Sequence, residues 1–392
     1  MLENLKPQSP DALLALIKLY ADDERAEKID LGVGVYRTDD GATPVFGAIK
    51  AAEGRLIEEQ DSKSYLGPEG DMGFVHALMP YIFGRDPMRG GRIEGMQTPG
   101  GTGAVRLAVA LAQAAGVGRV LMGTPSWPNH AQILADVGLE TVTFDHATAD
   151  GEANLDALNA VLGQAGKGDA VLLHAACHNP TGIDYTPEQW QAIAARVVER
   201  GVLPIIDCAY HGLGEGMDED VAGLRIMVDA VPEALVAYSC DKNFGLYRDR
   251  VGALYALARN ADDLKLIFAN ANALARAAWS MPPDHGAAAV RFVLRDPDLT
   301  EQWQDEVSSM RARMRQVREK LAAADNKVPG LDLAQLADQN GLFAMLPLTK
   351  EQIQRLRDDH AVYMAGSGRI NIAGLTSGNV DTFIDALAAV TA

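Results

Sequence analysis

Short β-rich runs alternate with helical patterns between residues 92 and 258 of this 392-residue chain. The strand candidates are 118–122, 140–144, 170–174, 202–206, 235–238 and 252–256. The helix candidates between them include 102–114, 155–162 and 187–200, and the last begins after Thr186, a good capping residue. Alternation of this kind predicts an α/β fold, in which a mostly parallel sheet is flanked by helices on both faces.

The pattern changes after residue 258. Long helices are expected at 260–277, 285–295 and 299–323, followed by a strand at 341–347, a helix at 350–360 and a strand at 368–372. We therefore expect a large domain over residues 44–306. Residues 1–43 and 307–392 are expected to form a smaller α+β domain, because the N-terminal segment is too short to fold alone.

The charge of the chain restricts its partners. The sequence has 53 acidic and 35 basic residues, which gives a net charge of -18. Little positive charge is available to neutralise phosphates, so we expect neither nucleic acid nor anionic membranes as partners. We find no basic start followed by an apolar core and no apolar run of membrane-spanning length. Three cysteines without a CxxC pair fit a reducing compartment, so a cytoplasmic location is expected.

A lysine follows one of the expected buried strands. Lys242 comes soon after the apolar run 234–238, with Ser239 before it and Arg250 after it. A lysine at the carboxyl end of such a strand faces the crevice where open α/β sheets bind ligands. Lysine forms Schiff bases with carbonyl compounds, including pyridoxal phosphate. Taken alone, the segment is equally compatible with a solvated lysine on a loop.

Two further segments suggest contacts to a ligand. Residues 98–104 contain glycines just before a helix, where backbone N–H groups and the helix dipole attract anions, and Thr102 adds a hydroxyl. An ordinary glycine-rich turn would have the same composition. Asp207 ends the strand 202–206 and Tyr210 follows it. Such a carboxylate is either a helix cap or a contact to a charged ligand.

The remaining candidates also follow expected strands. Trp127 lies between two prolines, where its ring can stack on a planar ligand or pack in the core. His174 and His178 precede a turn at Asn179. We expect no metal there, because no cluster with ligand spacing accompanies the two histidines. Together, a lysine, a phosphate-binding turn, an arginine, a carboxylate, a tyrosine and a stacking ring would hold a phosphorylated pyridine aldehyde.

From about residue 5 to its end, the chain resembles the aspartate and aromatic aminotransferases, class I enzymes of the fold-type I pyridoxal-phosphate family. The resemblance is carried by the motifs LGVGVY (31–36), YLG (65–67), GTG (101–103), PSWPNH (125–130), CHNPTG (177–182), KNFG (242–245), PP (282–283) with HG (285–286), and RINIAG (369–374). It implies a pyridoxal-phosphate transferase fold and a homodimer whose active sites are shared between the two subunits.

The resemblance implies roles around the cofactor ring. Lys242 binds the cofactor covalently and then moves the substrate's α-proton. Asp207 pairs with the protonated ring nitrogen, and Tyr210 hydrogen-bonds the ring oxygen. These three residues are the expected catalytic set. Asn179 also hydrogen-bonds the ring oxygen, and Trp127 stacks on the ring.

The resemblance also implies contacts to the phosphate and to the substrate. The phosphate is held by Gly101, Thr102, Ser239 and Arg250, with Tyr65 reaching over from the second subunit. The substrate is bound by Gly34, Trp127, Asn179, Arg276 and Arg369. Arg369 grips the α-carboxylate, and Arg276 binds a distal carboxylate across the dimer interface. No metal is implied.

Four positions depart from the family pattern. Ser64 replaces a common asparagine before Tyr65, and Trp279 replaces a common tyrosine. Asp241 stands where a serine is usual, and a carboxylate near the phosphate weakens the cofactor site unless it points away. Met281 stands where the aspartate enzymes usually carry asparagine, which makes the pocket for the distal group less polar.

The expected activity is transfer of the amino group of L-aspartate, L-glutamate or an aromatic amino acid to a 2-oxo acid such as 2-oxoglutarate. Two alternatives stay open at this point. One is β-elimination or β-decarboxylation on the same cofactor, which differs only in the fate of the carbanion. The other is a non-catalytic phosphate-binding protein, which Lys242 together with Asp207 and Tyr210 disfavours.

Overall fold

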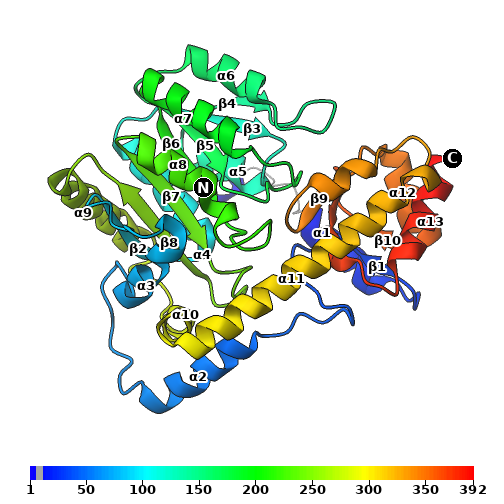
Figure 1. The fold of residues 1–392 in the computed structure, drawn as a ribbon, viewed down its shortest axis with the longest axis horizontal. Coiled ribbons are helices and arrows are strands. Elements are labelled where there is room, and N and C mark those ends of the chain that lie inside the picture. Colours follow the sequence, from blue (N-terminus) through cyan, green and yellow to red (C-terminus); the bar gives the residue numbers. More distant parts are fainter. Residues whose placement is uncertain (6–11) are drawn as a thin grey trace. The chain divides into compact units, whose positions relative to one another are not determined.

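The computed structural model describes residues 1–5 and 12–392 (Figure 1). The chain divides into two compact units: Met1–Thr43 with Arg313–Ala392, and Pro44–Ala312. This division and the expected domain boundary at residue 306 both lie inside one helix, α11 (Pro297–Ala323). A continuous helical pattern has no break that could mark such a boundary in the sequence.

A seven-stranded sheet lies at the centre of the unit 44–312, in the order β2-β8-β7-β6-β5-β3-β4. Its strands are β2 (Ile93–Pro99), β3 (Arg119–Thr124), β4 (Glu140–Asp145), β5 (Asp169–His174), β6 (Leu203–Cys208), β7 (Ala234–Ser239) and β8 (Val251–Leu257). Strands β7, β6, β5, β3 and β4 run parallel, whereas β8 is antiparallel to both of its neighbours. The expected α/β class with a mostly parallel sheet is confirmed.

Helices cover the sheet of this unit. They are α2 (Gly47–Glu59), α3 (Met72–Phe83), α4 (Gly100–Ala114), α5 (Pro128–Val137), α6 (Leu155–Gln164), α7 (Pro187–Arg200), α8 (Ala222–Ala230), α9 (Ala261–Ala278), α10 (His285–Arg295) and the first part of α11, with a 3-10 turn at η2 (Glu219–Val221). Helix α7 begins with the expected cap, since Thr186 and Gln189 form a reciprocal capping box with Pro187 in the first turn.

The burial of the strands explains their composition. Leu172, Leu235 and Leu254 belong to one apolar cluster with residues of α4, α5 and α9. Neighbouring residues such as Val171 and Val236 point to the opposite face and are buried too. Both faces are therefore covered, as parallel sheets require, and the strands read as continuous apolar runs rather than as alternating patterns.

The other unit contains two small sheets. Strand β1 (Ile29–Asp30) pairs in parallel with β10 (Val362–Tyr363), and β9 (Phe343–Met345) pairs antiparallel with β11 (Arg369–Asn371). Its helices are α1 (Ala12–Asp22), the end of α11, α12 (Lys350–His360) and α13 (Val380–Thr391), with 3-10 turns at η1 (Leu2–Asn4), η3 (Asp325–Lys327), η4 (Ala334–Asp338) and η5 (Ile372–Gly374). Two-residue strands such as β1 carry too little pattern to be recognised in a sequence.

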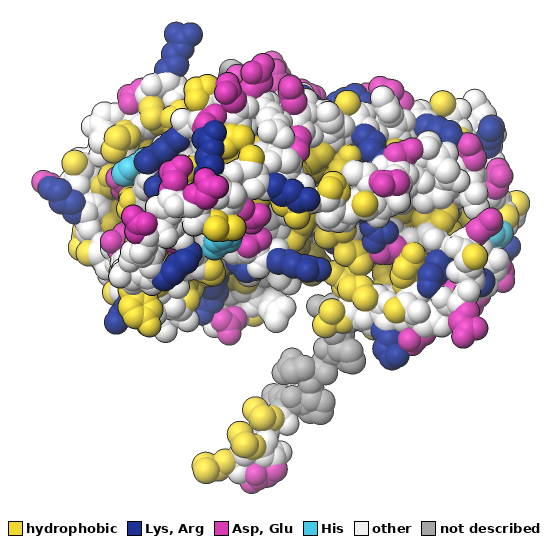
Figure 2. Space-filling model, turned by 90° about the horizontal axis from the view of Figure 1, so that it is seen from below, with side chains coloured by type: hydrophobic (Ala, Val, Ile, Leu, Met, Phe, Trp, Pro, Cys, Tyr) yellow, Lys and Arg dark blue, Asp and Glu magenta, His cyan; other side chains and the backbone are white. Residues whose placement is uncertain are grey.

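The surface carries charges of both signs. On the face shown in Figure 2, basic and acidic side chains are interspersed. Within residues 1–5 and 12–392, no helix combines the length and the apolar character needed to cross a membrane. Cys177, Cys208 and Cys240 are buried and free of disulfides.

Candidate active site

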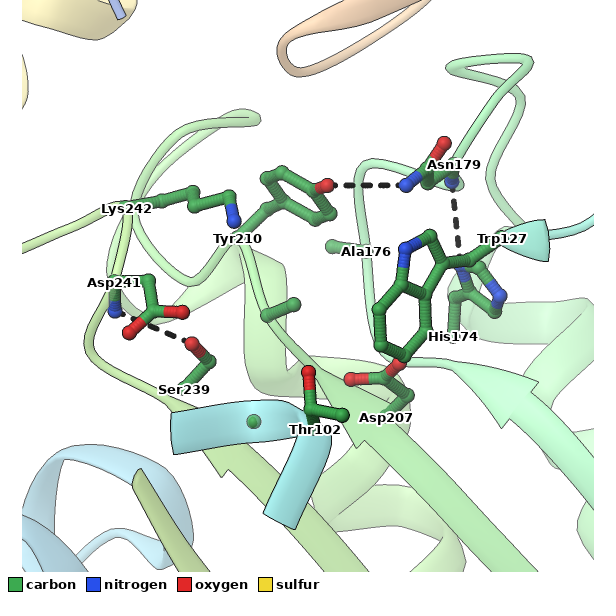
Figure 3. A pocket seen from close by; sticks show the side chains of 12 residues that line it. Thr102, Trp127, His174, Ala176, Asn179, Asp207, Tyr210, Ser239, Asp241 and Lys242 are labelled. Atoms are coloured by element: carbon green, nitrogen blue, oxygen red, sulfur yellow. Dashed lines mark hydrogen bonds between the residues drawn. The ribbon is translucent and has the colours of Figure 1, made fainter. Parts of the chain in front are cut away.

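A cavity of about 70 Å³ lies at the carboxyl ends of β5, β6 and β7 (Figure 3). It is lined by Gly101, Thr102, Trp127, His174, Ala176, Asn179, Asp207, Ala209, Tyr210, Ser239, Asp241 and Lys242. Eight of the thirteen site residues expected from the sequence are in this set. They meet because parallel strands in register, such as β5 and β6 with His174 opposite Asp207, end at a common edge.

Lys242 enters the cavity from the loop that follows β7. Every residue of β7 is buried, and the N–H of Cys240 donates to the carbonyl of Val251, which fixes the start of the loop. The Lys242 Nζ lies 5.8 Å from the centre of the Tyr210 ring and 5.5 Å from that of Tyr247. Burial of the amino group lowers the pKa of Lys242 below its usual value. A lysine with a lowered pKa is more readily the neutral amine that attacks a carbonyl carbon.

The loop that carries Lys242 is anchored from α11. Trp303 is fully buried, its ring stacks on Phe244 at 4.4 Å, and its Nε1–H donates to the carbonyl of Asn243 at 2.6 Å. The two residues that follow the lysine are thus held by one indole. This packing limits the positions that the lysine backbone can adopt.

Asp207 is held at the opposite wall of the cavity. Its Oδ2 lies 2.8 Å from Nε2 of His130, and Nδ1 of His130 lies 3.0 Å from Oγ of Ser126. A carboxylate only accepts, so the His130 Nε2–H donates to Asp207, and the Ser126 hydroxyl donates to Nδ1. The contact fixes the orientation of the carboxylate, which lines the cavity.

A row of imidazoles continues behind His130. The ring centre of His130 is 5.1 Å from that of His174, and the His174 ring centre is 4.3 Å from that of His178. His178 stacks on His146 with ring centres 3.5 Å apart. Burial lowers the pKa of His146 to about 4 and holds the pKa values of His174 and His178 well below their usual range. The row therefore lines this wall with neutral rings at physiological pH.

Three side chains surround the space between Lys242 and Asp207. Trp127 immediately precedes α5 and meets His130 edge to face at 5.0 Å. The Asn179 amide donates to the Tyr210 hydroxyl at 3.2 Å (Figure 3). The Asn179 Oδ1 is buried, and within the described residues no group donates a hydrogen bond to it. A ligand donor or hydroxyl at this point would satisfy that oxygen.

The start of α4 forms an anion-binding end of the cavity. A Cβ added to Gly101 would lie 2.7 Å from Cβ of Ser239, so a side chain there would fill the space beside the helix terminus. The free N–H groups of the first turn, the helix dipole and the hydroxyls of Thr102 and Ser239 favour a phosphate. Arg250 lies beside this terminus, since its guanidinium would be 2.5 Å from a Cβ on Gly100.

Besides Arg250, two expected residues of the same unit do not line the cavity. Tyr65 is 92% exposed. Arg276 is exposed at the end of α9, where it donates to Oγ of Ser280 at 2.8 Å. Both positions leave their side chains available to another molecule.

The last two expected residues lie in the other unit. Arg369 begins β11, donates to the carbonyl of Gly32 at 2.9 Å and lies 4.4 Å over the ring of Phe343. Gly34 packs on the same ring, because a Cβ there would be 2.6 Å from its Cζ. Asn371 supports the segment by donating to the carbonyls of Val33 and Val35. Gly34 and Arg369 thus belong to one local arrangement.

Sequence reasoning missed the part played by His130 and the row behind it. His130 lies in the PSWPNH motif, and this match is the only signal in the sequence that pointed to it. For His174 and His178 the sequence suggests only a metal pair, which the lack of further ligand spacing disfavours. Among the described residues, no group of three or more His, Cys, Asp or Glu side chains is arranged to hold a metal ion.

Comparisons with known proteins agree with this geometry. Residues 26–387 match the family described as aminotransferase class I and II. A tyrosine aminotransferase of Rhizobium meliloti is 50% identical over 376 residues, 96% of each chain. An aspartate aminotransferase of Escherichia coli is 40% identical over 395 residues and covers 100% of both chains. The solved aromatic-amino-acid aminotransferase of Burkholderia pseudomallei, covalently bound to pyridoxal phosphate, superposes with a TM-score of 0.97 at 32% identity over 100% of both chains.

The cavity has the groups that pyridoxal phosphate requires. Its aldehyde needs an amine, and Lys242 supplies one with a lowered pKa. Its ring nitrogen needs a carboxylate, and its phosphate needs the glycine-lined start of α4. Its ring oxygen needs polar partners such as the amide of Asn179, which has a buried oxygen without a protein donor. The residues present therefore fit this group.

Proposed function

This chain belongs to the class I and II aminotransferases, and we propose that it moves the amino group of aspartate, glutamate or an aromatic amino acid to a 2-oxo acid such as 2-oxoglutarate. Its cofactor is pyridoxal phosphate. The observation that carries the proposal is the convergence of Lys242, Asp207 and the start of α4 on one cavity. When bound, the cofactor supplies an electron sink for the carbanion left after loss of the α-proton.

The side chains of the cavity would divide the work. Lys242 would hold the cofactor covalently and, once released from it, take the α-proton on Nζ and return it to another carbon. Asp207, oriented by His130, would keep the ring nitrogen protonated. Tyr210 and Asn179 would bind the ring oxygen, and Trp127 would stack on the ring. Gly101, Thr102, Ser239 and Arg250 would hold the phosphate.

The substrate carboxylates would be bound by two arginines. Arg369 would grip the α-carboxylate, beside Gly34. Arg276 would bind a distal carboxylate in the site of the partner subunit. Met281 at the end of the same segment offers a soft apolar surface for aromatic rings. Relatives named for tyrosine and for aspartate at 50% and 40% identity support a substrate range that includes both classes.

We also propose a homodimer with shared sites, in the cytoplasm. Large apolar side chains at Ile57, Tyr65, Leu66 and Leu266 are exposed on the unit 44–312, which supports burial against a second copy. Tyr65 would then reach the partner's phosphate. The three cysteines, which form no disulfide, fit a reducing compartment.

Borohydride reduction followed by peptide mapping tests the covalent attachment. The label should be found on Lys242, and Lys242→Ala should take up none. The purified enzyme should then be assayed with aspartate, glutamate, tyrosine and phenylalanine as amino donors against 2-oxoglutarate, oxaloacetate and glyoxylate. Label on another lysine would overturn the site. Release of ammonia or carbon dioxide in place of amino transfer would favour β-elimination or β-decarboxylation.

A further inference from the structure

A buried carboxylate stands at the phosphate end of the cavity. Asp241 is 5% exposed and its side chain points into the cavity beside Ser239, opposite Thr102 (Figure 3). Its Oδ2 accepts a hydrogen bond from Nη1 of Arg250 at 2.5 Å. Its Oδ1 is buried and has no hydrogen-bond partner among the residues that the structure describes. Asp241 therefore engages Nη1 of the guanidinium that would also bind the phosphate.

We propose that Asp241 competes with the cofactor phosphate for Arg250, so that phosphate binding drives the uptake of one proton by the Asp241 carboxylate. The inference rests on the proposed placement of the phosphate at the start of α4. The proton comes from solvent and ends on Oδ1 or Oδ2, and no other bond changes.

The physical basis is the cost of two anions in one buried space. An ionised Asp241 repels the phosphate and shares its cation, and two like charges this close strongly disfavour joint ionisation. A protonated Asp241 no longer competes. Its Oδ1, which now has no partner, could carry the proton and donate it in a hydrogen bond to a phosphate oxygen. Burial already raises the pKa of Asp241 above its usual value, and an adjacent phosphate would raise this pKa further.

Other charged groups face Asp241 and act on the same equilibrium. Lys242 and Arg250 favour its ionised form, and the backbone N–H of Asp241 donates to Oγ of Ser239 at 3.2 Å. The Cys240 thiol stays neutral, because burial holds its pKa well above the usual range. From α4, the residues Gly100, Gly101 and Thr102 contribute no titratable side chain. Asp207 acts on Lys242 from β6. The phosphate itself titrates with a second pKa of about 6, so wild type and variant must be compared at each pH.

The sign of the effect follows from proton uptake. Between the Asp241 pKa without phosphate and the higher pKa with phosphate, affinity should fall as pH rises. Asp241→Asn keeps the size of the side chain and removes its charge. The part of the pH dependence of pyridoxal-phosphate affinity that comes from Asp241 should therefore disappear. Above that range, the asparagine variant should bind pyridoxal phosphate about 10- to 100-fold more tightly than wild type, since one like charge is removed from a partly buried site.

The test is equilibrium dialysis of the full-length protein with pyridoxal phosphate, and in parallel with pyridoxal, which lacks the phosphate. Wild type, Asp241→Asn and Asp241→Ser should be compared from about pH 5.5 to 8.5, a range that spans the phosphate titration. Asp169→Asn is the matched control. It also removes a carboxylate paired with an arginine, Arg119, but at the start of β5, the opposite edge of the sheet. Circular dichroism and the thermal midpoint identify any variant that fails to fold.

The inference predicts that both Asp241 variants bind pyridoxal phosphate more tightly than wild type at high pH. At low pH the ratio of variant affinity to wild-type affinity should approach one. Binding of pyridoxal, and binding by the Asp169→Asn control, should change little. Equal or weaker binding of pyridoxal phosphate in both folded variants would overturn it, because Asp241 would then merely position Arg250. An equal gain for pyridoxal would overturn it too, because Asp241 would act on Lys242. Peptide mapping distinguishes a failure of this inference from a failure of the proposed function. If the label is found on Lys242 but the Asp241 variants bind pyridoxal phosphate like wild type, only this inference is refuted.

Discussion

Replacing His146 with phenylalanine should change how the stability of the protein depends on pH. His146 is 4% exposed, stacks on His178 and lies 2.8 Å through Nε2 from the carbonyl of Ile183. Burial lowers its pKa from 6.5 to about 4. Since the folded pKa is below the unfolded one, the unfolded chain binds more protons, and stability is lost as pH falls from 6.5 towards 4.

The magnitude follows from these two pKa values. At pH 7.5 both states are neutral, and the variant should be about 1–2 kcal/mol less stable than wild type, because the Ile183 carbonyl loses its donor. At pH 5 the unfolded imidazole is protonated and the folded one is not, which costs wild type about 2 kcal/mol. The variant does not bear this cost. The difference between the two proteins should therefore shrink to about zero or change sign.

Urea unfolding at both pH values, with the same saturating pyridoxal phosphate, measures this difference. Tyr185→Phe is the matched control. The Tyr185 ring meets His146 at 5.4 Å, its hydroxyl has no partner among the described residues, and burial raises the pKa of that hydroxyl further above neutrality. Its effect should be the same at both pH values. A gap between wild type and His146→Phe that stays constant with pH would refute the argument, because the buried imidazole would then not be held neutral.

Three further predictions concern the proposed catalytic groups. Asp207→Ala should leave the fold intact but lower turnover by several orders of magnitude, because a charge pair at about 4 Å is worth on the order of 4 kcal/mol at an effective dielectric of about 20. Near-normal half-reaction rates in this variant would remove Asp207 from the mechanism. Arg369→Ala should lower kcat/KM for all substrates alike. Arg276→Ala should cost about 2–5 kcal/mol in kcat/KM for aspartate and little for phenylalanine. An equal loss for both substrate classes would show that Arg276 is structural. Mixing Lys242→Ala with Arg276→Ala chains should restore some aspartate activity in hybrid dimers; no recovery despite proven subunit exchange would count against shared sites.

The ligand-binding edge could be anticipated because it depends on local order along the chain. Asp207 lies at the carboxyl end of the buried strand β6 and Lys242 follows β7, and the carboxyl ends of parallel strands share one edge of a sheet. Thr102 was assigned to the same edge from the glycines before α4. For such residues, the strand pattern alone predicts that they lie close together in space.

Contacts made across the fold could not be read from the sequence. The pair of His130 with Asp207 joins residues 77 positions apart, one on α5 and one on β6, so only the tertiary fold brings them together. The sequence does not determine the direction of the Asp241 side chain, because a loop residue can point towards or away from a pocket. The structure turns it inward onto Arg250. Strand β2 was not identified, since Glu94 and Gln97 interrupt its apolar character.

The direction of β8 decides where Arg250 can act. Arg250 precedes strand β8, yet it lies near Ser239 and Asp241, which lie at or after the carboxyl end of β7. Since β8 runs antiparallel, Val251 lies opposite Pro99, the last residue of β2, and Gly252 lies opposite Ser239, the last residue of β7. A parallel β8 of the same seven residues would place its first residue at the far edge, about 20 Å away. The short connection 240–250, which returns the chain into an antiparallel β8, thus brings the cation to the anion-binding end.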